Sequence, residues 1–129
     1  MRAYLPLSED DIDLLSRGDS LAVEGRLAVS PTPGLAVSME TADEEELDLI
    51  AALSAVDLAE STSAVAVLEA EGVVVDDAIG EVALIGSVPL GDVQCLLVGD
   101  LESQEVSWFG IQELDHLQAA VKATHKEQK

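Results

Sequence analysis

The chain has 129 residues, a formal net charge of −20 and no lysine or arginine between Arg26 and Lys122. Surfaces that bind nucleic acids or anionic membranes use lysine and arginine to neutralise phosphates, so the composition argues against both kinds of partner. The same charge favours solubility and would attract a basic protein.

The length fits one domain, and we expect a single acidic globular domain over residues 1–129, with a frayed tail from about residue 125. With one Trp, one Tyr and one Phe, the core must consist of aliphatic side chains. The single cysteine, Cys95, excludes an internal disulfide and is typical of a reducing compartment. No apolar run reaches the roughly 18 residues of a membrane-spanning helix. These features predict a cytoplasmic protein.

The N-terminal third is predicted to contain two strands and one helix. A strand over residues 2–6 is followed by a helix that Ser8 caps, with acidic residues in its first turn and Gly18 after its end. A second strand covers residues 27–30. The segment Pro31-Thr32-Pro33-Gly34 then predicts a turn.

The strongest helical pattern covers residues 43–60, where Thr41 and Glu44 have the spacing of a capping box. Two apolar stripes run along nearly opposite sides of this helix, whereas a helix on a protein surface needs only one. We therefore expect the helix to be covered twice, by its own sheet and by a further surface. The first stripe consists of Leu47, Ile50, Ala51, Ser54 and Leu58, and the second of Leu49, Leu53 and Val56.

The second half of the chain alternates in the manner of strands after a break near Ser61. The predicted strands cover residues 64–69, 73–75, 81–88 and 92–98. The second of these is a short edge strand within a loop. Pro89-Leu90-Gly91 predicts a turn that joins the last two strands as an antiparallel pair. A final helix is predicted from about Trp108 to about His125.

The last predicted strand is apolar on both faces, which is typical of a strand in the middle of a covered sheet. Its predicted faces are Val93, Cys95 and Leu97 on one side, and Leu96 and Val98 on the other. Together the elements predict an α/β (α+β) protein with one mixed sheet of about five strands and three helices, in the order β-α-β-α-β-β-β-α.

Five short motifs occur in a fixed order along nearly the whole chain. They are Met1-Arg2-Ala3-Tyr4-Leu5-Pro6, Ala28-Val29-Ser30-Pro31, Ala42-Asp43-Glu44-Glu45-Glu46-Leu47, Val88-Pro89-Leu90 and Trp108-Phe109-x-x-Gln112-Glu113-Leu114. With them the chain resembles a family of small actinobacterial proteins classed only as a domain of unknown function. The resemblance implies an actinobacterial cytosolic protein and no particular activity. The family carries arginines after the long helix, whereas this chain has Ser61-Thr62-Ser63, so a basic role of that segment would be absent.

Acidic clusters are the first candidates for a metal site. The consecutive acids at residues 43–46 point in different directions on a helix, and the positive end of the helix dipole explains them better than an ion does. Asp76, Asp77 and Glu81 lie in and beside one loop, where oxygens can converge on a calcium ion, but no EF-hand spacing is present. We therefore predict no metal ligand, with the loop cluster as the open alternative.

Catalytic residues are not predicted either. Cys95 lies in an apolar, anionic setting without a base, which indicates a core thiol rather than a nucleophile. Glu113-x-x-His116 has the spacing of carboxylate di-metal helices, but such sites need a second copy of the motif. No nucleophile-elbow, dinucleotide-binding or Walker pattern occurs, so we predict no cofactor. The 26 acids permit some carboxylate pair, but the scarcity of aromatic residues argues against a sugar site.

The candidate interface residues are apolar side chains without a clear place in the core. Trp108 and Phe109 are adjacent at the predicted start of the last helix, so they cannot both face the same core. Either one packs inside while the other staples the helix start, or one is exposed as an interface anchor. The second stripe of the long helix would form the centre of a homodimer. The predicted interface residues are Leu49, Leu53, Val56, Trp108 and Phe109.

These features predict a non-catalytic protein-binding or assembly module with a strongly acidic surface. Its partner is expected to be a protein, either a second copy of the chain or a basic protein, and not a nucleic acid or a membrane. One alternative is a ligand-binding protein or hydrolase-like enzyme that uses carboxylates on a neutral or cationic molecule. A further alternative is a DNA mimic that binds a basic protein. A pocket lined by converging acids would favour the first alternative, and a flat apolar patch around Trp108 or the long helix would favour protein binding.

Overall fold

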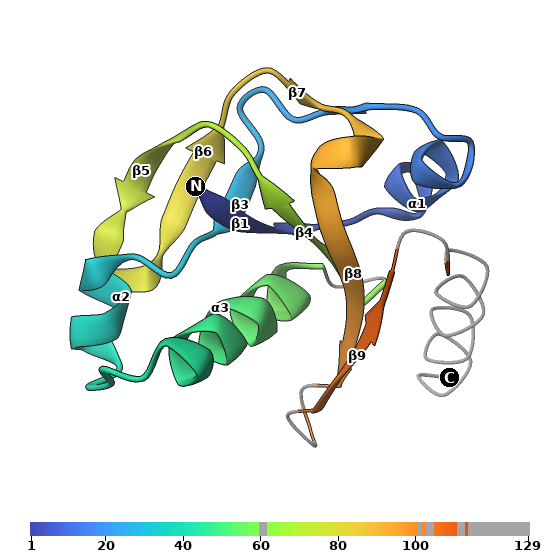
Figure 1. Ribbon diagram of the computed structural model, residues 1–129. Coiled ribbons are helices and arrows are strands. Elements are labelled where there is room, and N and C mark those ends of the chain that lie inside the picture. The colour runs from blue at the N-terminus through green and yellow to red at the C-terminus, as the bar shows by residue number, and fades with distance from the viewer. Residues whose placement is uncertain (60–61, 101, 103–104, 111–112, 114–129) are drawn as a thin grey trace.

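The computed structural model describes residues 1–59, 62–100, 102, 105–110 and 113 (Figure 1). Within these residues the chain forms three α-helices, two short 3₁₀ helices and nine strands. In chain order they are β1 (Arg2–Pro6), α1 (Glu9–Ser16), β2 (Leu21–Ala22), β3 (Leu27–Val29), α2 (Pro33–Ser38), α3 (Glu44–Leu58), β4 (Ala64–Glu69), β5 (Gly72–Asp76), η1 (Asp77–Ile79), β6 (Glu81–Leu84), β7 (Ser87–Val88), η2 (Leu90–Asp92), β8 (Val93–Asp100) and β9 (Glu105–Phe109).

Seven strands form one antiparallel sheet in the order β5-β6-β3-β1-β4-β8-β9, and β2 pairs with β7 in a separate ribbon. The prediction of an α+β protein with one large sheet is confirmed. Two of the three predicted helices are present as α1 and α3, whereas α2 was not predicted and most of the predicted last helix lies outside the described residues. The predicted number of strands and their order are wrong, and the large sheet is antiparallel rather than mixed. The reason is that β1 lies in the centre and pairs antiparallel with both β3 and β4, so no helix connects two parallel neighbours.

The predicted strand over residues 81–88 is two strands in different sheets. Gly86, with a φ of 81°, adopts the left-handed conformation that glycine tolerates, and the chain turns out of the large sheet there. Strand β6 therefore pairs with β3 and β5, while β7 pairs with β2. The predicted antiparallel pairing of residues 81–88 with 92–98 is wrong, because β8 pairs with β4 and β9 instead.

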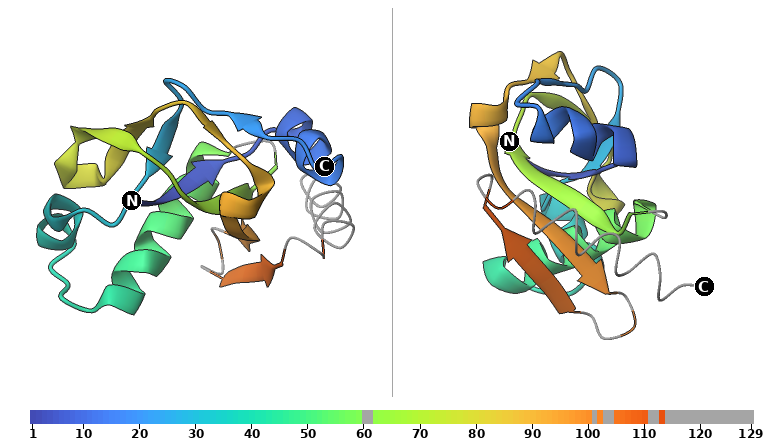
Figure 2. Two further views of the ribbon diagram at one scale, coloured as in Figure 1. Left: turned by 45° about the horizontal axis from the view of Figure 1, so that its top comes forward. Right: turned by 90° about the vertical axis from the view of Figure 1, so that its right-hand side faces the viewer.

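The sheet is covered on both faces. Side chains alternate along β1, so Ala3 and Leu5 belong to one core cluster and Tyr4 to the other. The first cluster includes Ile12 and Leu15 of α1, and the second includes the buried side of α3. Figure 2 shows α1 and α3 on opposite sides of the sheet. The structure is therefore a three-layer arrangement around a central antiparallel sheet.

Strand β8 is an inner strand covered on both faces, as its sequence predicts, although it lies next to the edge strand β9 and not in the middle of the sheet. Its faces also differ from the prediction. The register shifts between Val67 and Leu68 of β4, which pair with Cys95 and Val93 respectively. Gln94 is the extra residue of this bulge, so the alternation of side chains restarts beyond it. Val93 therefore joins Leu96 and Val98 in the first core cluster, whereas Cys95 and Leu97 face the second.

Helix α3 begins where the acidic run predicts, although Asp43 rather than Thr41 caps it. The Asp43 carboxylate accepts hydrogen bonds from the backbone N–H groups of Glu45 and Glu46. The buried side of the helix falls between the two predicted stripes and consists mainly of small side chains. It contains Ala51, Ala52, Ala55 and Val56, whereas Leu49 and Leu58 are exposed. The prediction of two apolar stripes covered on opposite sides is wrong in part. Leu47, Ile50 and Ala51 of the first stripe pack against the core, whereas Val56 is the buried member of the second. Small side chains allow the helix to approach the sheet more closely than leucine would.

Two further segments differ from the prediction. Pro31-Thr32-Pro33-Gly34 does not end in a simple turn, because the Thr32 hydroxyl caps α2 and Pro33 occupies its first turn. Trp108 and Phe109 lie in strand β9 and not at the start of a helix. Residues 111–112 and 114–129 of the predicted last helix and tail, including His116 and His125, lie outside the described residues. No helix among the described residues combines the length and the apolar character needed to cross a membrane.

Asp11 and Arg26 form the most buried ion pair in the described part of the chain. The two Arg26 Nη atoms lie 3.0 and 2.8 Å from the two Asp11 carboxylate oxygens, and Arg26 also donates to the carbonyl of Pro6 at 3.0 Å. Asp11 accepts the backbone N–H of Ser8 in the capping box of α1. Burial alone would raise the pKa of Asp11, but the hydrogen bonds from Arg26 and Ser8 hold that pKa below its usual value. This pair ties α1 to the end of β1 and to the start of β3.

Replacing Arg26 is expected to destabilise the fold in a pH-dependent way. Arg26→Met leaves a nearly buried carboxylate without its cation and should lower the free energy of unfolding at pH 7 by about 2–3 kcal/mol. Because the folded-state pKa of Asp11 is depressed, the stability that the pair supplies is complete above about pH 4 and is lost as pH falls through the folded pKa. Urea unfolding at a series of pH values measures both effects.

The matched control is Arg17→Met, since Arg17 lies 3.7 Å from Asp19 in a pair that is well exposed. This variant should change stability by less than about 0.5 kcal/mol. Equal effects of the two substitutions, or a cost of Arg26→Met that persists undiminished at about pH 2, would contradict the assigned role of the pair.

Gly99 is expected to be required for the packing of α3 on the sheet. A Cβ atom at this position would lie 2.6 Å from Cγ2 of Val56, so Gly99→Ala should destabilise the protein by about 1–3 kcal/mol although alanine suits a strand better than glycine. Gly91→Ala is the control, since no atom lies within 4 Å of the corresponding position. In a double-mutant cycle, Gly99→Ala should cost less in a Val56→Ala background. Thermal unfolding measures the stability of each single and double variant. If the costs of Gly99→Ala and Val56→Ala simply add in the double variant, a clash between the two side chains is not the cause.

Candidate functional site

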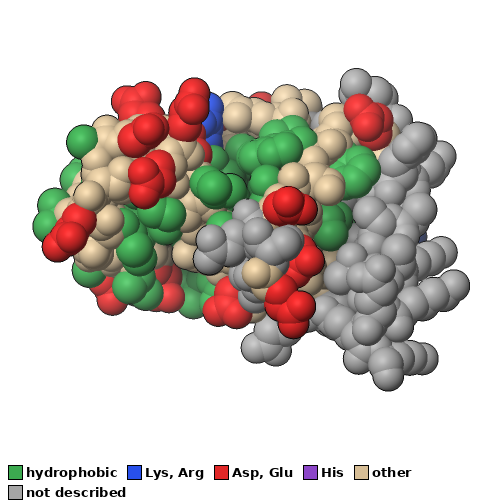
Figure 3. Space-filling model, turned by 90° about the horizontal axis from the view of Figure 1, so that it is seen from below, with side chains coloured by type: hydrophobic (Ala, Val, Ile, Leu, Met, Phe, Trp, Pro, Cys, Tyr) green, Lys and Arg blue, Asp and Glu red, His purple; other side chains and the backbone are tan. Residues whose placement is uncertain are grey.

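A groove lies where the N-terminal half of α3 passes beneath strands β1, β4, β8 and β9. Its volume is about 330 Å³, and one wall comes from the helix and the other from the sheet. The lining residues are Arg2, Tyr4, Glu45, Asp48, Leu49, Val67, Gln94, Cys95 and Trp108. Figure 3 looks onto the side of the molecule on which α3 lies in Figure 1, and it shows hydrophobic side chains gathered between acidic ones.

The alternation of side chains along β9 places Trp108 at this groove. Trp108 pairs with Leu97, which faces α3, whereas Phe109 pairs with Leu96 and packs against the core on the other face. Trp108 is 52% exposed, and Leu49 is 39% exposed on the opposite wall. The two adjacent aromatic residues are therefore separated by the sheet. One contributes to the core and the other to the groove.

The predicted interface residues do not form one surface. Leu49 and Trp108 come together in the groove, while Leu53 is half-buried and does not line it. Val56 is 2% exposed and packs beneath Gly99, so it supplies no surface for a partner. An interface centred on the stripe of Leu49, Leu53 and Val56 is therefore incompatible with the packing of α3.

The polar part of the groove was not predicted. The Nη1 atom of Arg2 lies 3.2 Å from the Asp48 carboxylate, beside the buried Tyr4. Burial and the Asp48 charge raise the pKa of Tyr4 to about 12, so its hydroxyl stays protonated at neutral pH. Arg2 and Tyr4 share a strand face, which period-2 alternation could have shown. Asp48 belongs to α3, and only the packing of this helix on the sheet brings it to them.

The groove lacks the arrangement of a nucleophilic site. Burial raises the pKa of the Cys95 thiol, and the nearby Arg2 offsets this only in part. The thiol is half-buried, and the described residues that line the groove supply it with the carboxylates Glu45 and Asp48 but no histidine. A thiolate is therefore disfavoured at neutral pH.

The acids of the predicted loop cluster have structural partners. One oxygen of the Asp76 carboxylate accepts the N–H of Ala78, and one of the Asp77 carboxylate accepts the N–H of Gly34. Glu81 lies on strand β6, opposite Val29 of β3 on one side and Asp76 of β5 on the other. Among the described residues, no group of three His, Cys, Asp or Glu side chains is arranged to hold a metal ion.

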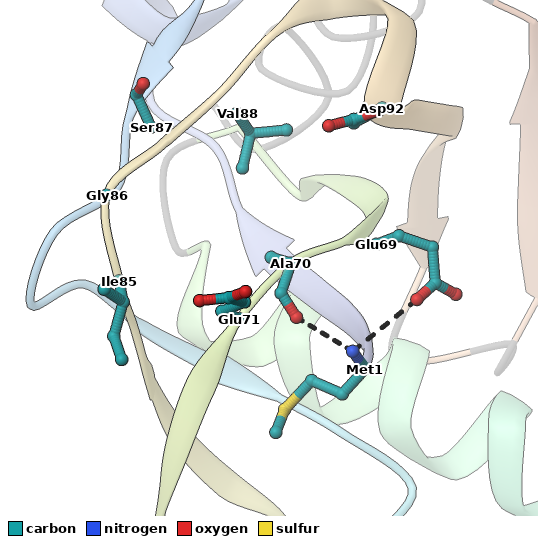
Figure 4. A pocket seen from close by; sticks show the side chains of 9 residues that line it. All are labelled: Met1, Glu69, Ala70, Glu71, Ile85, Gly86, Ser87, Val88 and Asp92. Carbon is teal, nitrogen blue, oxygen red and sulfur yellow. Dashed lines mark hydrogen bonds and ion pairs between the residues drawn. The ribbon is translucent and has the colours of Figure 1, made fainter.

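A second cleft, of about 460 Å³, is lined by more acids than the groove. Its lining residues are Met1, Glu69, Ala70, Glu71, Ile85, Gly86, Ser87, Val88 and Asp92 (Figure 4). The Met1 amino group donates to the carbonyl of Ala70 at 2.9 Å and lies 3.6 Å from the Glu69 carboxylate. In Figure 4 the carboxylates of Glu71 and Asp92 lie apart from this pair and from each other. The cleft therefore does not bring its acids together around one point.

Comparison with protein-family models, with curated proteins and with solved structures finds no match. The resemblance to a family of small actinobacterial proteins therefore stays a prediction. The candidate site rests on the geometry of the groove.

Cys95 is expected to react slowly in the folded protein. It is half-buried and its pKa is raised, so alkylation by iodoacetamide at about pH 8 should be at least about tenfold slower than in the protein unfolded by guanidinium. Because the chain has a single cysteine, the intact mass reports this reaction directly. Equal rates in the folded and unfolded protein would show that the thiol is open to solvent and would contradict the described wall of the groove.

Proposed function

We propose that this chain is a non-catalytic protein-binding module whose groove beside Trp108 receives an apolar side chain of a partner protein. The supporting observation is the exposure of the only tryptophan in a chain whose aromatic content is 2%. Full burial of a large aromatic side chain would stabilise an aliphatic core more than any other single residue. Trp108 instead lies half-exposed above a groove, a position typical of an interface anchor.

The groove walls favour a partner that is both apolar and basic. Leu49 and Trp108 offer apolar surface, and the buried Val67 also lines the groove. Glu45 and Asp48 also line the groove, and Arg2, the one cation among its described lining residues, already pairs with Asp48. An apolar side chain flanked by lysine or arginine would therefore bury its apolar part against Trp108 and place its cations near carboxylates.

The alternative of a small-ligand protein or an enzyme that acts through carboxylates has less support. It requires acids that converge in a pocket, and the carboxylates of the second cleft lie apart (Figure 4). The DNA-mimic alternative requires a continuous array of acids, whereas hydrophobic side chains interrupt the acidic ones on the face seen in Figure 3.

The partner can be found and tested through the groove itself. A photo-crosslinking amino acid at Leu49 should capture a protein in the source cells that the same group at Val37, which is 78% exposed on α2, does not capture. With that protein purified, Trp108 fluorescence should change on binding, because the only tryptophan lies at the site. Trp108→Ala should weaken the affinity at least about tenfold, measured by calorimetry.

Val37→Ala is the control for the affinity measurement, and it should bind like the wild type. Affinity should also fall as salt is raised from about 0.05 to 0.5 M, because carboxylates surround the groove. An affinity unchanged in a folded Trp108→Ala variant would remove the groove as the binding site. Preferential capture of a small molecule at Leu49 would favour the alternative function.

A further inference from the structure

Strand β5 lies at one edge of the large sheet, and no described element covers its free edge. Among the described residues it pairs with β6 on one side only, at the end of the sheet opposite to β9 (Figure 1). Its three consecutive valines, Val73, Val74 and Val75, are 59%, 46% and 55% exposed. Natural proteins usually protect an edge strand with charges, a proline, a β-bulge or a covering segment. Within the described structure β5 has a register shift between Val74 and Asp76, but the centre of the strand carries no charge, proline or cover.

The pairing of β5 with β6 shows which peptide groups face outward. Val73 pairs with Ala83, and the N–H of Ile85 donates to the carbonyl of Glu71 at 3.0 Å. In an antiparallel ladder, alternate residues exchange hydrogen bonds with the same neighbour, so Glu71 and Val73 direct their peptide groups toward β6. Gly72 and Val74 therefore direct theirs toward the free edge.

We propose that a second copy of this chain pairs with β5 in antiparallel fashion, across a twofold axis at Val73. In this register Gly72 faces Val74 of the partner subunit, and each of the two equivalent pairs exchanges both of its N–H···O bonds. Val73 faces Val73 of the partner subunit at a non-hydrogen-bonded position, where opposing side chains are closest. Free donors and acceptors of one copy thus meet those of the other.

The sequence of the edge favours a second copy over an unrelated strand. A twofold interface uses the same patch twice, so that patch must be complementary to itself. In the proposed register Glu71 faces Val75 of the partner subunit, and no acid lies directly opposite an acid. The opposed valines would also remove apolar surface from water.

Three features limit the strength of this association. The register with β6 shifts between Val74 and Asp76, so the regular part of the edge is short. One added strand buries less than the roughly 1,200 Å² of a stable interface. The formal charge of −20 on each copy adds repulsion that salt screens. The dimer should therefore be weak, and it should strengthen with ionic strength, whereas binding of a basic partner at the groove should weaken.

Disulfide coupling tests the register. In a Cys95→Ser background, Val73→Cys should form a disulfide-linked dimer under mild oxidation, because the two side chains meet across the axis at a spacing that a disulfide can bridge. Val75→Cys, at a similarly exposed position, would face Glu71 of the partner subunit and should couple at least about tenfold more slowly. Equal coupling rates would overturn the register.

Sedimentation at a protein concentration of about 200 μM tests the association in the native chain. The average mass should rise above the 13.5 kDa of one chain as salt increases from about 0.05 to 0.5 M. Val74→Pro should abolish this rise, since it removes an outward N–H that the fold does not use, and proline is tolerated at such edge positions. Trp108→Ala should leave the rise in mass unchanged, because self-association through β5 does not use the groove. A monomeric mass at every salt concentration, or a dimer that a folded Val74→Pro variant still forms, would overturn the proposal.

Discussion

The close approach of α3 to the central sheet is the constraint on which the rest of the structure depends. A chain with so few aromatic residues must fill its core with small aliphatic side chains, and these fill space only when the backbones lie close together. Ala51, Ala52 and Ala55 form the helix side of this contact, and Gly99 leaves room for Val56 on the sheet side. Because the alanines occupy the core, Leu49 remains outside it and lines the groove.

The few basic side chains near the N-terminus are engaged within the fold. Arg26 binds Asp11, Arg2 binds Asp48, and Arg17 lies beside Asp19. The pairs differ in what they do, since only that of Arg26 connects elements through a nearly buried carboxylate. The consequence is a described surface on which acids outnumber cations and each arginine already has an acidic neighbour. Such a surface favours basic partners and disfavours phosphate-bearing ones.

The two candidate interaction surfaces lie at opposite edges of the same sheet. The groove is formed beside β9, and the exposed valines lie on β5. Pairing through β5 would join two sheets into one and leave both grooves at its far ends. A dimer of this kind would present two equivalent sites, and a partner that carries two binding segments would gain avidity from it. The proposed self-association and the proposed binding site are thus compatible in space and independent in chemistry.

Local patterns determined much of the secondary structure before any tertiary contact was considered. The alternation in β1 and β4, the capping of α1 by Ser8 and the acidic start of α3 depend on neighbours within a few residues, so their sequences predict them. The same holds for the inner position of β8, whose apolar residues on both faces demand cover on both sides. The exclusion of a cationic surface follows from composition alone.

Tertiary structure alone decided which strands pair, which side of α3 is buried and which residues form the groove. Pairing depends on where the chain leaves a sheet, and one glycine conformation, at Gly86, separates β6 from β7. The buried side of α3 depends on how closely a helix and a sheet can approach, which hydrophobicity does not encode. The groove unites Arg2, Asp48 and Trp108 from three distant segments, and no local pattern shows that they meet. The sequence thus determined the secondary structure that depends on near neighbours, and the packing of helix against sheet determined the groove.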